Sequence, residues 1–384
     1  MSRPLSRPAR VLLIDHAPVF GGAESFLFDL ASGLDRDRFS PIIVTMPDSP
    51  VLERFRATGI PAYTTPMPRL NRSPYFFWRL WRAGVQLARL ARGLRADLMH
   101  TFTARTHLVG AVAARQVGIP LLWRICDDTL PDWLLRLFSR VPRHIVSVSR
   151  WLTSRYPHIR FDGFVPDGAR PPRAITQAEA RAALCLAPDD LIIAHVGRLV
   201  RWKGQAVLLH ALADLYPHIS HLRGLFVGGW SADDDVSGPL GGGAPYLKEL
   251  QALAAGLNLE DRVTFTGFLS EPALGYAAAD IVTHTSILPE PFGRVVIEAM
   301  LAGRPVVATD AGAIPEIITP GESGVLVPVN HPSALANALT QLIGDPGLRT
   351  RLGESAQRRV ADEFSLDKMV ERMQSAYQSA LAKS

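Results

Sequence analysis

The sequence predicts an α/β protein with two doubly wound domains, each a parallel sheet with helices on both faces. Three observations support this prediction. A chain of 384 residues is too long for one hydrophobic core. Short β-branched runs alternate with longer helical patterns, which is typical of parallel sheets covered by helices. The alternation stops once, near the middle of the chain, and then starts afresh.

The strands are expected at short apolar runs separated by helical patterns such as 23–33 and 51–59. The first half contains five such runs, at 11–14, 41–46, 97–100, 120–125 and 144–149. The second half contains six, at 191–197, 224–228, 263–267, 280–284, 305–309 and 324–327. A final amphipathic helix is expected over 365–381, with one apolar stripe of Leu366, Met369, Met373 and Tyr377.

The junction between the halves runs from Asp162 to about Pro188 and is rich in Pro, Gly and Arg. Its doublet Pro171-Pro172 forces extended backbone and cannot continue a helix. We therefore expect an N-terminal domain over 1–170, a C-terminal domain over 171–364, and a last helical segment over 365–384. Two such domains would face a central cleft, because open α/β sheets bind ligands at the carboxyl ends of their strands.

Composition excludes several classes of protein. With 47% hydrophobic and 20% charged residues the chain is globular, and no apolar run approaches the roughly 20 residues of a membrane span. Cys126 and Cys185 are the two cysteines, too few for a disulfide framework or a zinc cluster. The polar stretch 231–245, with adjacent aspartates at 233–235, is interpreted as a solvated loop rather than a metal site. We expect a cytoplasmic protein.

The first segment that carries chemistry is Gly197-Arg-Leu-Val-Arg-Trp-Lys-Gly204, which follows a predicted strand and opens a predicted helix. A loop at a helix N-terminus offers N–H groups and a positive dipole to a diphosphate. Arg198 and Lys203 would add fixed positive charge on the same ligand. The same two residues also fit an ordinary solvated loop.

The second segment is Glu290-Pro-Phe-Gly-Arg-Val-Val-Ile-Glu298. Carboxylates accept strongly from sugar hydroxyls, so Glu290 before a helix and Glu298 inside it would grip two parts of an extended sugar nucleotide. Gly293 allows the backbone to approach a ligand. A third segment, Val263–Leu269, ends in Gly267 and Phe268, which suit a nucleobase but equally a core strand and its turn.

Together these segments resemble the retaining glycosyltransferases of the GT-B fold, family-four type (glycosyl transferases group 1), which have two Rossmann-like domains. The resemblance implies that the domain over 1–170 is the acceptor side and that the domain over 171–364 binds the donor nucleotide sugar. It also implies that the helix over 365–384 crosses back onto the N-terminal domain. The resemblance covers nearly the whole chain. Its other motifs are Gly21-Gly-Ala-Glu24, Gly303-Arg-Pro-Val-Val-Ala-Thr-Asp310, Gly312-Ala-Ile-Pro-Glu316 and Gly321-Glu-Ser-Gly324.

The resemblance implies that Arg198 and Lys203 bind the donor diphosphate and assist its departure, with no metal or other cofactor. It implies that Glu290 contacts the transferred sugar and that Glu298 holds the ribose hydroxyls. Donor contacts are also expected at Gly21, Gly22, Gly267, Phe268, Phe292, Gly293, Arg294 and Val295. In such enzymes the sugar keeps its anomeric configuration, and the departing diphosphate itself takes the acceptor proton.

One position departs from the family pattern. Many relatives carry a histidine after the fourth strand, whose imidazole approaches the transferred sugar, whereas this chain has Cys126 there. A thiol does not accept a proton as imidazole does. Asp127 or Asp128 would serve instead, and Asp127 is the candidate we carry forward; His100 and His107 lie on nearby segments.

A basic amphipathic helix is expected over 73–94, with an aromatic cluster at its start. One stripe holds Arg79, Arg82, Gln86 and Arg89, while the apolar residues are Phe77, Leu80, Trp81, Val85, Leu87 and Leu94. Such a helix either packs with a charged outer face or rests on an anionic membrane. Nucleic-acid binding is not expected, because no reading motif accompanies the charge.

These observations predict a retaining transferase that moves a hexose-type sugar from a nucleotide-diphosphate donor to a glycan, lipid-linked or small-molecule acceptor. Two alternatives remain. One is a sugar-nucleotide-binding partner without turnover, and the other is a nucleotide-sugar epimerase on the same architecture.

Overall fold

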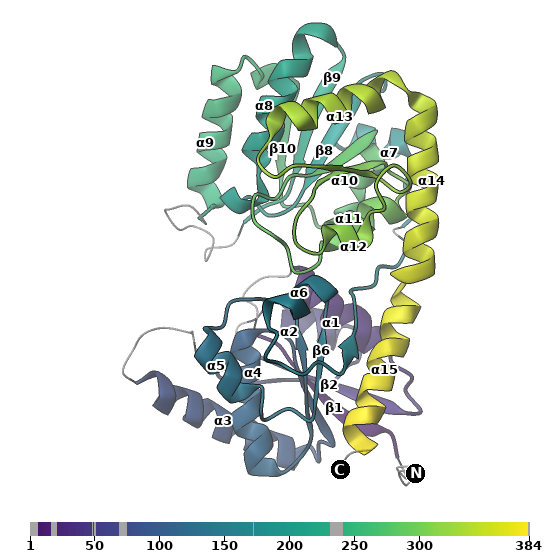
Figure 1. Cartoon of the computed structure of the whole chain (residues 1–384). Helices are drawn as coiled ribbons and strands as arrows, with labels where there is room; N and C mark the ends of the chain where they lie inside the picture. Colours follow the sequence, from purple (N-terminus) through teal and green to yellow (C-terminus); the bar gives the residue numbers. More distant parts are fainter. Residues whose placement is uncertain are drawn as a thin grey trace. The chain divides into compact units, whose positions relative to one another are not determined.

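The computed structural model describes residues 7–16, 21–47, 49, 51–68, 75–171, 173–230 and 241–382. The chain forms two compact units. Unit 1 contains Met1–Gly168 together with Leu366–Ser384, and unit 2 contains Ala169–Ser365. In each unit a parallel sheet runs through the middle with helices on both faces (Figure 1), which confirms the predicted α/β fold.

Unit 1 holds a seven-stranded sheet in the order β3-β2-β1-β4-β5-β6-β7, with every neighbouring pair parallel. Its strands are β1 (Ala9–Ile14), β2 (Phe39–Thr45), β3 (Ala62–Thr64), β4 (Leu98–Thr101), β5 (Leu121–Ile125), β6 (His144–Ser147) and β7 (Gly163–Phe164). Its helices are α1 (Gly22–Gly33), α2 (Val51–Arg56), α3 (Phe76–Gly93), α4 (Ala104–Val117), α5 (Asp132–Phe138), α6 (Arg150–Arg155) and α15 (Leu366–Ala382).

Both faces of the unit 1 sheet are buried, because successive strand residues point to opposite sides. Val11 and Leu13 join a core with α1 and α15, whereas Ile14 lies against α4 on the other face. Helix α15 is fastened to this sheet by Tyr377, whose hydroxyl lies 2.6 Å from Nδ1 of the buried His100. The last helix of the chain is therefore part of the unit 1 core.

Unit 2 holds a six-stranded parallel sheet in the order β10-β9-β8-β11-β12-β13. Its strands are β8 (Leu191–Val196), β9 (Leu222–Val227), β10 (Val263–Gly267), β11 (Ile281–His284), β12 (Val306–Thr309) and β13 (Val325–Val327). Its α-helices are α7 (Gln177–Ala183), α8 (Gln205–Leu215), α9 (Gly243–Gly256), α10 (Ala273–Ala278), α11 (Arg294–Leu301), α12 (Ile314–Ile317), α13 (Pro332–Gly344) and α14 (Pro346–Glu363). Three 3₁₀ turns complete it, η1 (Arg201–Lys203), η2 (Tyr216–His218) and η3 (Glu260–Arg262).

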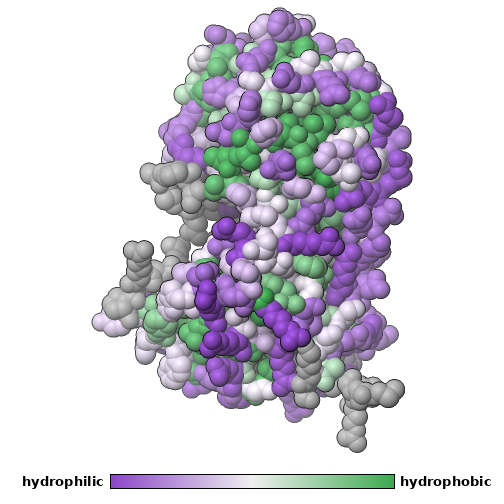
Figure 2. Space-filling view, viewed as in Figure 1, coloured by the Kyte–Doolittle hydropathy of each residue, from purple (hydrophilic) through white to green (hydrophobic). Residues whose placement is uncertain are grey.

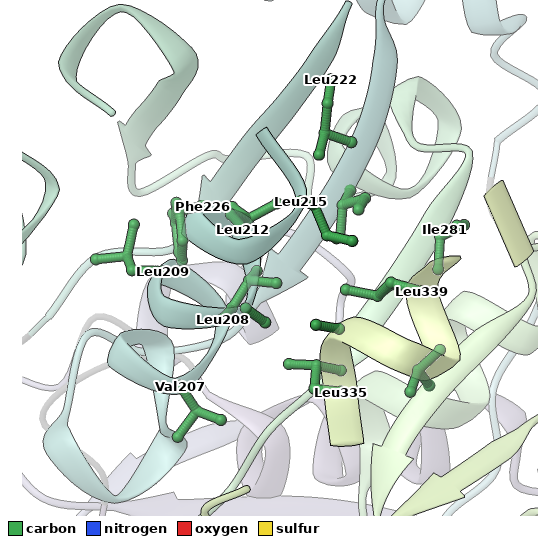
Figure 3. Packing of buried hydrophobic residues seen from close by; sticks show 14 of the residues in the cluster. Val207, Leu208, Leu209, Leu212, Leu215, Leu222, Phe226, Ile281, Leu335 and Leu339 are labelled. Carbon is green, nitrogen blue, oxygen red and sulfur yellow. The ribbon is translucent and has the colours of Figure 1, made fainter. Parts of the chain in front are cut away.

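Helix α8 is the centre of the main core of unit 2. Its Leu208, Leu212 and Leu215 are buried among residues of β9 and β11 and of α13, which contributes Leu335 and Leu339 (Figure 3). Helix α8 contacts both α9 and α13, while α10 contacts α7 and α11 contacts α14. The solvent face of α14 is hydrophilic, as the right edge of Figure 2 shows.

The eleven strands predicted from the sequence are present, with ends shifted by a few residues. The short strands β3 and β7 were not predicted. The junction over 162–188 contains two short elements, β7, which pairs with β6, and α7 at Gln177–Ala183. Residues 231–240 of the expected loop and Pro172 of the Pro-Pro doublet lie outside the described residues, and α9 already begins at Gly243.

Candidate functional site

The candidate donor site of unit 2 lies where the sheet changes its winding direction. The strand order steps from β8 to β9 and β10 on one side, and from β8 to β11, β12 and β13 on the other. Strands β8 and β11 are parallel neighbours, so the loops that follow them emerge side by side at one edge. Ligands of open α/β sheets bind outside the carboxyl ends of the strands at such a switch point.

Lys203 from the β8 loop and Glu290 from the β11 loop meet at this edge. The Lys203 Nζ lies 2.7 Å from Glu290 Oε1, and both side chains are nearly buried. Burial by itself would raise the pKa of Glu290, but the charges and hydrogen bonds of Lys203 and His284 outweigh it and hold that pKa well below its usual range. The structure thus brings together two of the predicted residues as an ionised pair.

Hydrogen bonds to backbone carbonyls join the two loops. Ile287 N–H donates to the carbonyl of Trp202 at 2.8 Å, and the Thr285 hydroxyl donates to the carbonyl of Gly204 at 2.8 Å. Gly204 has φ +71°, and a Cβ there would lie 2.0 Å from Thr285 O. Only glycine fits, because a side chain would meet both the left-handed backbone and a fixed carbonyl.

The other basic residues of the β8 loop have different surroundings. Arg198 is exposed at the end of β8, and its carbonyl accepts from the Gln205 side chain at 2.8 Å. Arg201 hydrogen-bonds to Glu249 of α9 through both of its terminal nitrogens. Its guanidinium is thereby engaged by a carboxylate of α9.

Glu298 is held inside α11 rather than projecting freely into solvent. Arg294 Nε donates to its Oε1 at 2.8 Å, and the Tyr276 hydroxyl donates to its Oε2 at 2.9 Å. Burial raises the pKa of Tyr276 well above its usual value, and the neighbouring Glu298 adds to this. Tyr276 therefore remains a hydroxyl donor, and the carboxylate keeps a fixed orientation.

Phe292, Gly293 and Val295, which were also predicted as donor contacts, lie around the start of α11. Phe292 is buried edge-on against Phe364, with ring centroids 5.9 Å apart. Gly293 has φ +125° and precedes the first residue of α11, Arg294, so helix N–H groups open beside it. Val295 is half-buried in the first turn of α11.

The predicted nucleobase residues follow β10, at the far edge of the sheet from β11. The Gly267 carbonyl accepts from Gly228 N–H at 3.1 Å, which ties the ends of β9 and β10 together. Phe268 is 71% exposed. Phe268 lies in the turn after β10 and outside the core, so both explanations of this segment stay open.

The predicted glycines of unit 1 form the start of α1. Gly21 precedes the helix, and its N–H donates to Glu24 Oε2 at 2.8 Å; Gly22 is the first helical residue. These residues, like Asp127, belong to unit 1.

Asp127 follows β5 and sits at the N-terminus of α4. The Ala104 N–H points at both of its oxygens, at 3.3 and 3.2 Å. Burial raises the pKa of Asp127 to about 6, and the negative charge of Asp128 adds to this rise against the Ala104 hydrogen bond. The neighbouring Cys126 donates its thiol to the Phe102 carbonyl at 3.3 Å, and burial raises the pKa of that thiol. Asp127 is thus the better proton acceptor of the two.

Two predicted histidines are structural. His107 stacks on Trp123 at 3.6 Å, and its ring nitrogens contact Thr101 Oγ1 and the Phe138 carbonyl. Burial lowers the pKa of His107 to about 3. His100 is bound to Tyr377 as described above.

Sequence reasoning missed four polar residues at the switch points of the two sheets. In unit 2, His284 and Ser286 contact the Glu290 carboxylate. In unit 1, His16 Nδ1 lies 3.0 Å from the Thr103 hydroxyl, where the segments after β1 and β4 meet. Their position just after a strand was the one available signal, and it does not reveal which strands become neighbours.

Two absences can be stated for the described ranges. No group of three or more His, Cys, Asp or Glu side chains is placed there to hold a metal ion. None of the helices there combines the length and the apolar character needed to cross a bilayer.

Family models match both units of this α/β architecture. The model for glycosyl transferases group 1 matches residues 176–359, and the model for glycosyltransferase family 4 matches residues 20–163. A D-inositol 3-phosphate glycosyltransferase of Streptomyces coelicolor is 34% identical over 74% of this chain and 69% of its own length. The chain therefore belongs to the family-four glycosyltransferases of the GT-B fold.

Other relatives match over a smaller share of their length. The D-inositol 3-phosphate glycosyltransferase of Streptomyces bingchenggensis is 35% identical over 65% of this chain, which is 51% of that protein. This chain thus spans about half the length of that curated relative. Among solved structures, Anabaena HepE in complex with UDP and glucose has a TM-score of 0.82 at 25% identity, covering 96% of this chain and 99% of HepE. The same protein has also been solved in complex with UDP-glucose.

Proposed function

We propose that the protein is a glycosyltransferase that takes a sugar from a nucleoside-diphosphate donor bound at the carboxyl edge of the unit 2 sheet. The observation that carries this proposal is the meeting of Lys203 and Glu290, 2.7 Å apart, on the loops after β8 and β11. An ammonium and a carboxylate at one switch point match the phosphate and the sugar of such a donor. Membership of the family supports the same activity.

Arg198 and Lys203 neutralise the diphosphate in this proposal. An ammonium has three N–H donors, so Lys203 can keep its bond to Glu290 and still donate to a phosphate oxygen. Arg198 adds a second cation at the end of β8. These fixed charges stabilise the negative charge that develops on the leaving diphosphate, and the proposal therefore needs no metal ion. Glu298 holds the ribose hydroxyls, because Arg294 and Tyr276 already fix its orientation.

The proposed reaction retains the anomeric configuration of the sugar. The bond from the anomeric carbon to the phosphate oxygen breaks, and a bond to the acceptor oxygen forms on the same face. The acceptor proton passes to the departing phosphate oxygen. Glu290 is a poor covalent nucleophile for a double displacement, because Lys203 and His284 hold its pKa well below the usual range and so make the carboxylate weakly basic. Asp127, with a pKa raised to about 6, is the candidate for the acceptor side.

A thermal-shift screen with nucleoside diphosphates and nucleotide sugars tests donor binding, because a ligand that binds only the folded state raises the melting temperature. UDP and UDP-glucose are tested first, since they are present in the HepE complexes. Arg198→Ala should weaken UDP binding about tenfold or more, whereas Arg201→Ala on the same loop should change it less than about twofold, because Arg201 pairs with Glu249. Absence of stabilisation by every nucleotide would refute the proposal.

Nucleotide release separates the transferase from its two alternatives. A transferase releases the nucleoside diphosphate faster when an acceptor is present. A binding partner without turnover releases none, and an epimerase changes the sugar without releasing nucleotide. The acceptor panel contains glycans, lipid-linked sugars and D-inositol 3-phosphate, the last because relatives carry it in their names. NMR of the product then reports whether the anomeric configuration is retained.

We further propose that unit 1 contacts an anionic membrane surface through α3 and α5. Phe77, Trp78 and Trp81 of α3 are each more than half exposed, as are Trp133 and Leu137 of α5. Exposed aromatic residues of this kind are typical of membrane-interface helices. The basic side of α3 lies with them, since the Arg82 guanidinium stands 5.5 Å over the Trp78 ring and Arg79 and Arg89 are exposed.

Helix α4 connects the two aromatic groups. Arg105, in its first turn, donates to the Pro68 carbonyl at 2.9 Å, next to the start of α3. His107, half a turn later, contacts the Phe138 carbonyl at the end of α5. The exposed aromatic residues of α3 and α5 therefore flank the same end of α4. Ser73 and Pro74, at the start of the helix expected from the sequence, lie outside the described residues.

Flotation with phosphatidylglycerol–phosphatidylcholine vesicles tests this contact. Wild type should float with the anionic vesicles and much less with pure phosphatidylcholine. Arg79→Glu/Arg82→Glu should abolish flotation, whereas Arg351→Glu/Arg358→Glu on α14 makes the same change in net charge at another exposed place. Equal flotation of the two double variants, or none for wild type, would remove the membrane proposal and leave the transferase proposal intact.

A further inference from the structure

The two oxygens of the Glu290 carboxylate have different surroundings. Three donors converge on Oε1: Lys203 Nζ at 2.7 Å, His284 Nε2 at 2.6 Å and the Ser286 hydroxyl. No residue in the described ranges donates to Oε2. Oε2 is also not one of the buried side-chain atoms that lack a partner, so it reaches solvent although Glu290 is only 8% exposed. Oε1 therefore has three donors, whereas Oε2 is open to solvent.

The local fold explains why His284 and Ser286 act together. His284 is the last residue of β11, and Ser286 follows two residues later, the spacing that places side chains on one side of an extended chain. The Ser286 backbone is fixed in turn, because the Thr309 hydroxyl at the end of β12 donates to its carbonyl at 3.0 Å. Both residues are almost completely buried. Their donors are therefore held in place before any ligand arrives.

The proton on His284 follows from its partners. A carboxylate only accepts, so Nε2 of His284 must carry the hydrogen that lies toward Glu290. Nδ1 of the same ring is buried and has no partner among the described residues. His284 therefore donates to Glu290 through Nε2.

We propose that His284 and Ser286 are positioning residues that anchor Glu290 through Oε1, so that Oε2 accepts a hydroxyl of the donor's transferred sugar. This inference rests on the proposed function and names the atom that performs it. A carboxylate held within about half an ångström contributes more to catalysis than one that must be ordered on binding. Lys203 belongs to the same anchor, but it also serves the diphosphate, so His284 and Ser286 are the selective probes.

The test compares UDP with UDP-glucose in purified full-length variants. His284→Leu removes the donor, His284→Gln keeps an N–H at a similar reach, and Ser286→Ala removes the second donor. Thr283→Val is the matched control, because Thr283 is buried on the same strand and donates to the Ala194 carbonyl instead of Glu290. Melting temperatures establish that each variant is folded.

His284→Leu should lower kcat for UDP release from UDP-glucose about tenfold to a hundredfold while changing the Kd for UDP less than about twofold. His284→Gln should recover most of kcat, Ser286→Ala should lose less than His284→Leu, and Thr283→Val should match wild type. Wild-type kcat in His284→Leu would overturn the inference, as would an equal loss of UDP and UDP-glucose binding. Failure of wild type to bind any nucleotide would instead refute the proposed function, and with it this inference.

Discussion

Replacing Lys203 by methionine tests the ion pair on which the donor site depends. The substitution keeps most of the aliphatic stem and removes the ammonium that lies 2.7 Å from Glu290 Oε1. The side chains of Lys203 and Glu290 are only 12% and 10% exposed, and breaking a buried pair by removing one partner costs about 3–5 kcal/mol. His284 and Ser286 still donate to the carboxylate, so we expect a smaller loss of about 2–3 kcal/mol in the free energy of unfolding.

The loss of stability should depend on pH. The pKa of Glu290 is held well below its usual value of 4.5 in the folded protein. Its stabilising contribution is therefore present above pH 4.5 and is lost as pH falls through the folded pKa. Without Lys203 the burial of Glu290 is opposed more weakly, so the folded pKa rises. Lys203→Met should therefore lose less stability than wild type during acid titration, because the pKa of Glu290 then differs less between the folded and unfolded states.

Turnover provides the second readout. Removing one preorganised charge contact costs about 2–4 kcal/mol of transition-state stabilisation, which is about 30-fold to 900-fold in kcat. Denaturant unfolding between pH 3.5 and 8 and UDP release from UDP-glucose measure the two effects, with Arg201→Ala as the control on the same loop. An acid titration of Lys203→Met that matches that of wild type would contradict the ion pair. A kcat of Lys203→Met equal to that of wild type would contradict the role of Lys203 in stabilising the leaving group.

Three further predictions concern the frame around the candidate site. Gly204→Ala should cost about 3 kcal/mol in denaturant unfolding, because φ is +71° and the new Cβ would lie 2.0 Å from a backbone carbonyl oxygen. Gly59→Ala is the control and should cost only about 1 kcal/mol, because Gly59 has a similar φ of +73° but open space around it. Equal losses of stability in the two variants would contradict a steric clash at Gly204. Tyr377→Phe should cost about 1–3 kcal/mol, since it removes the 2.6 Å contact with buried His100, and an unchanged unfolding midpoint would disprove that bond. Burial raises the pKa of Asp127 from 3.8 to about 6, so wild type should lose stability relative to Asp127→Asn as pH rises from about 4 to 6; parallel melting curves across this range would argue against the raised pKa.

Much of the fold follows from local sequence patterns. Strands in the middle of each sheet are buried on both faces, so runs such as Val11–Ile14 and Leu191–Val196 are almost entirely apolar and are readily recognised. The edge strands β3 and β7 lack this signal. They have three and two residues, and each is only partly covered, so pairing with a neighbour rather than composition makes them strands.

The chemistry of the candidate site was predictable, but the contacts between its residues were not. Local patterns indicated where an ammonium, a guanidinium and two carboxylates follow strand-like runs, because loops after strands are marked by glycine and charge. The folded sheet showed that β8 lies beside β11, which brings together Lys203 and Glu290, 87 residues apart in the chain. The same pairing selected His284 and Ser286, two ordinary strand-end residues, as donors to one carboxylate oxygen. Strand order is settled by the packing of whole helices and strands, and no local pattern encodes it.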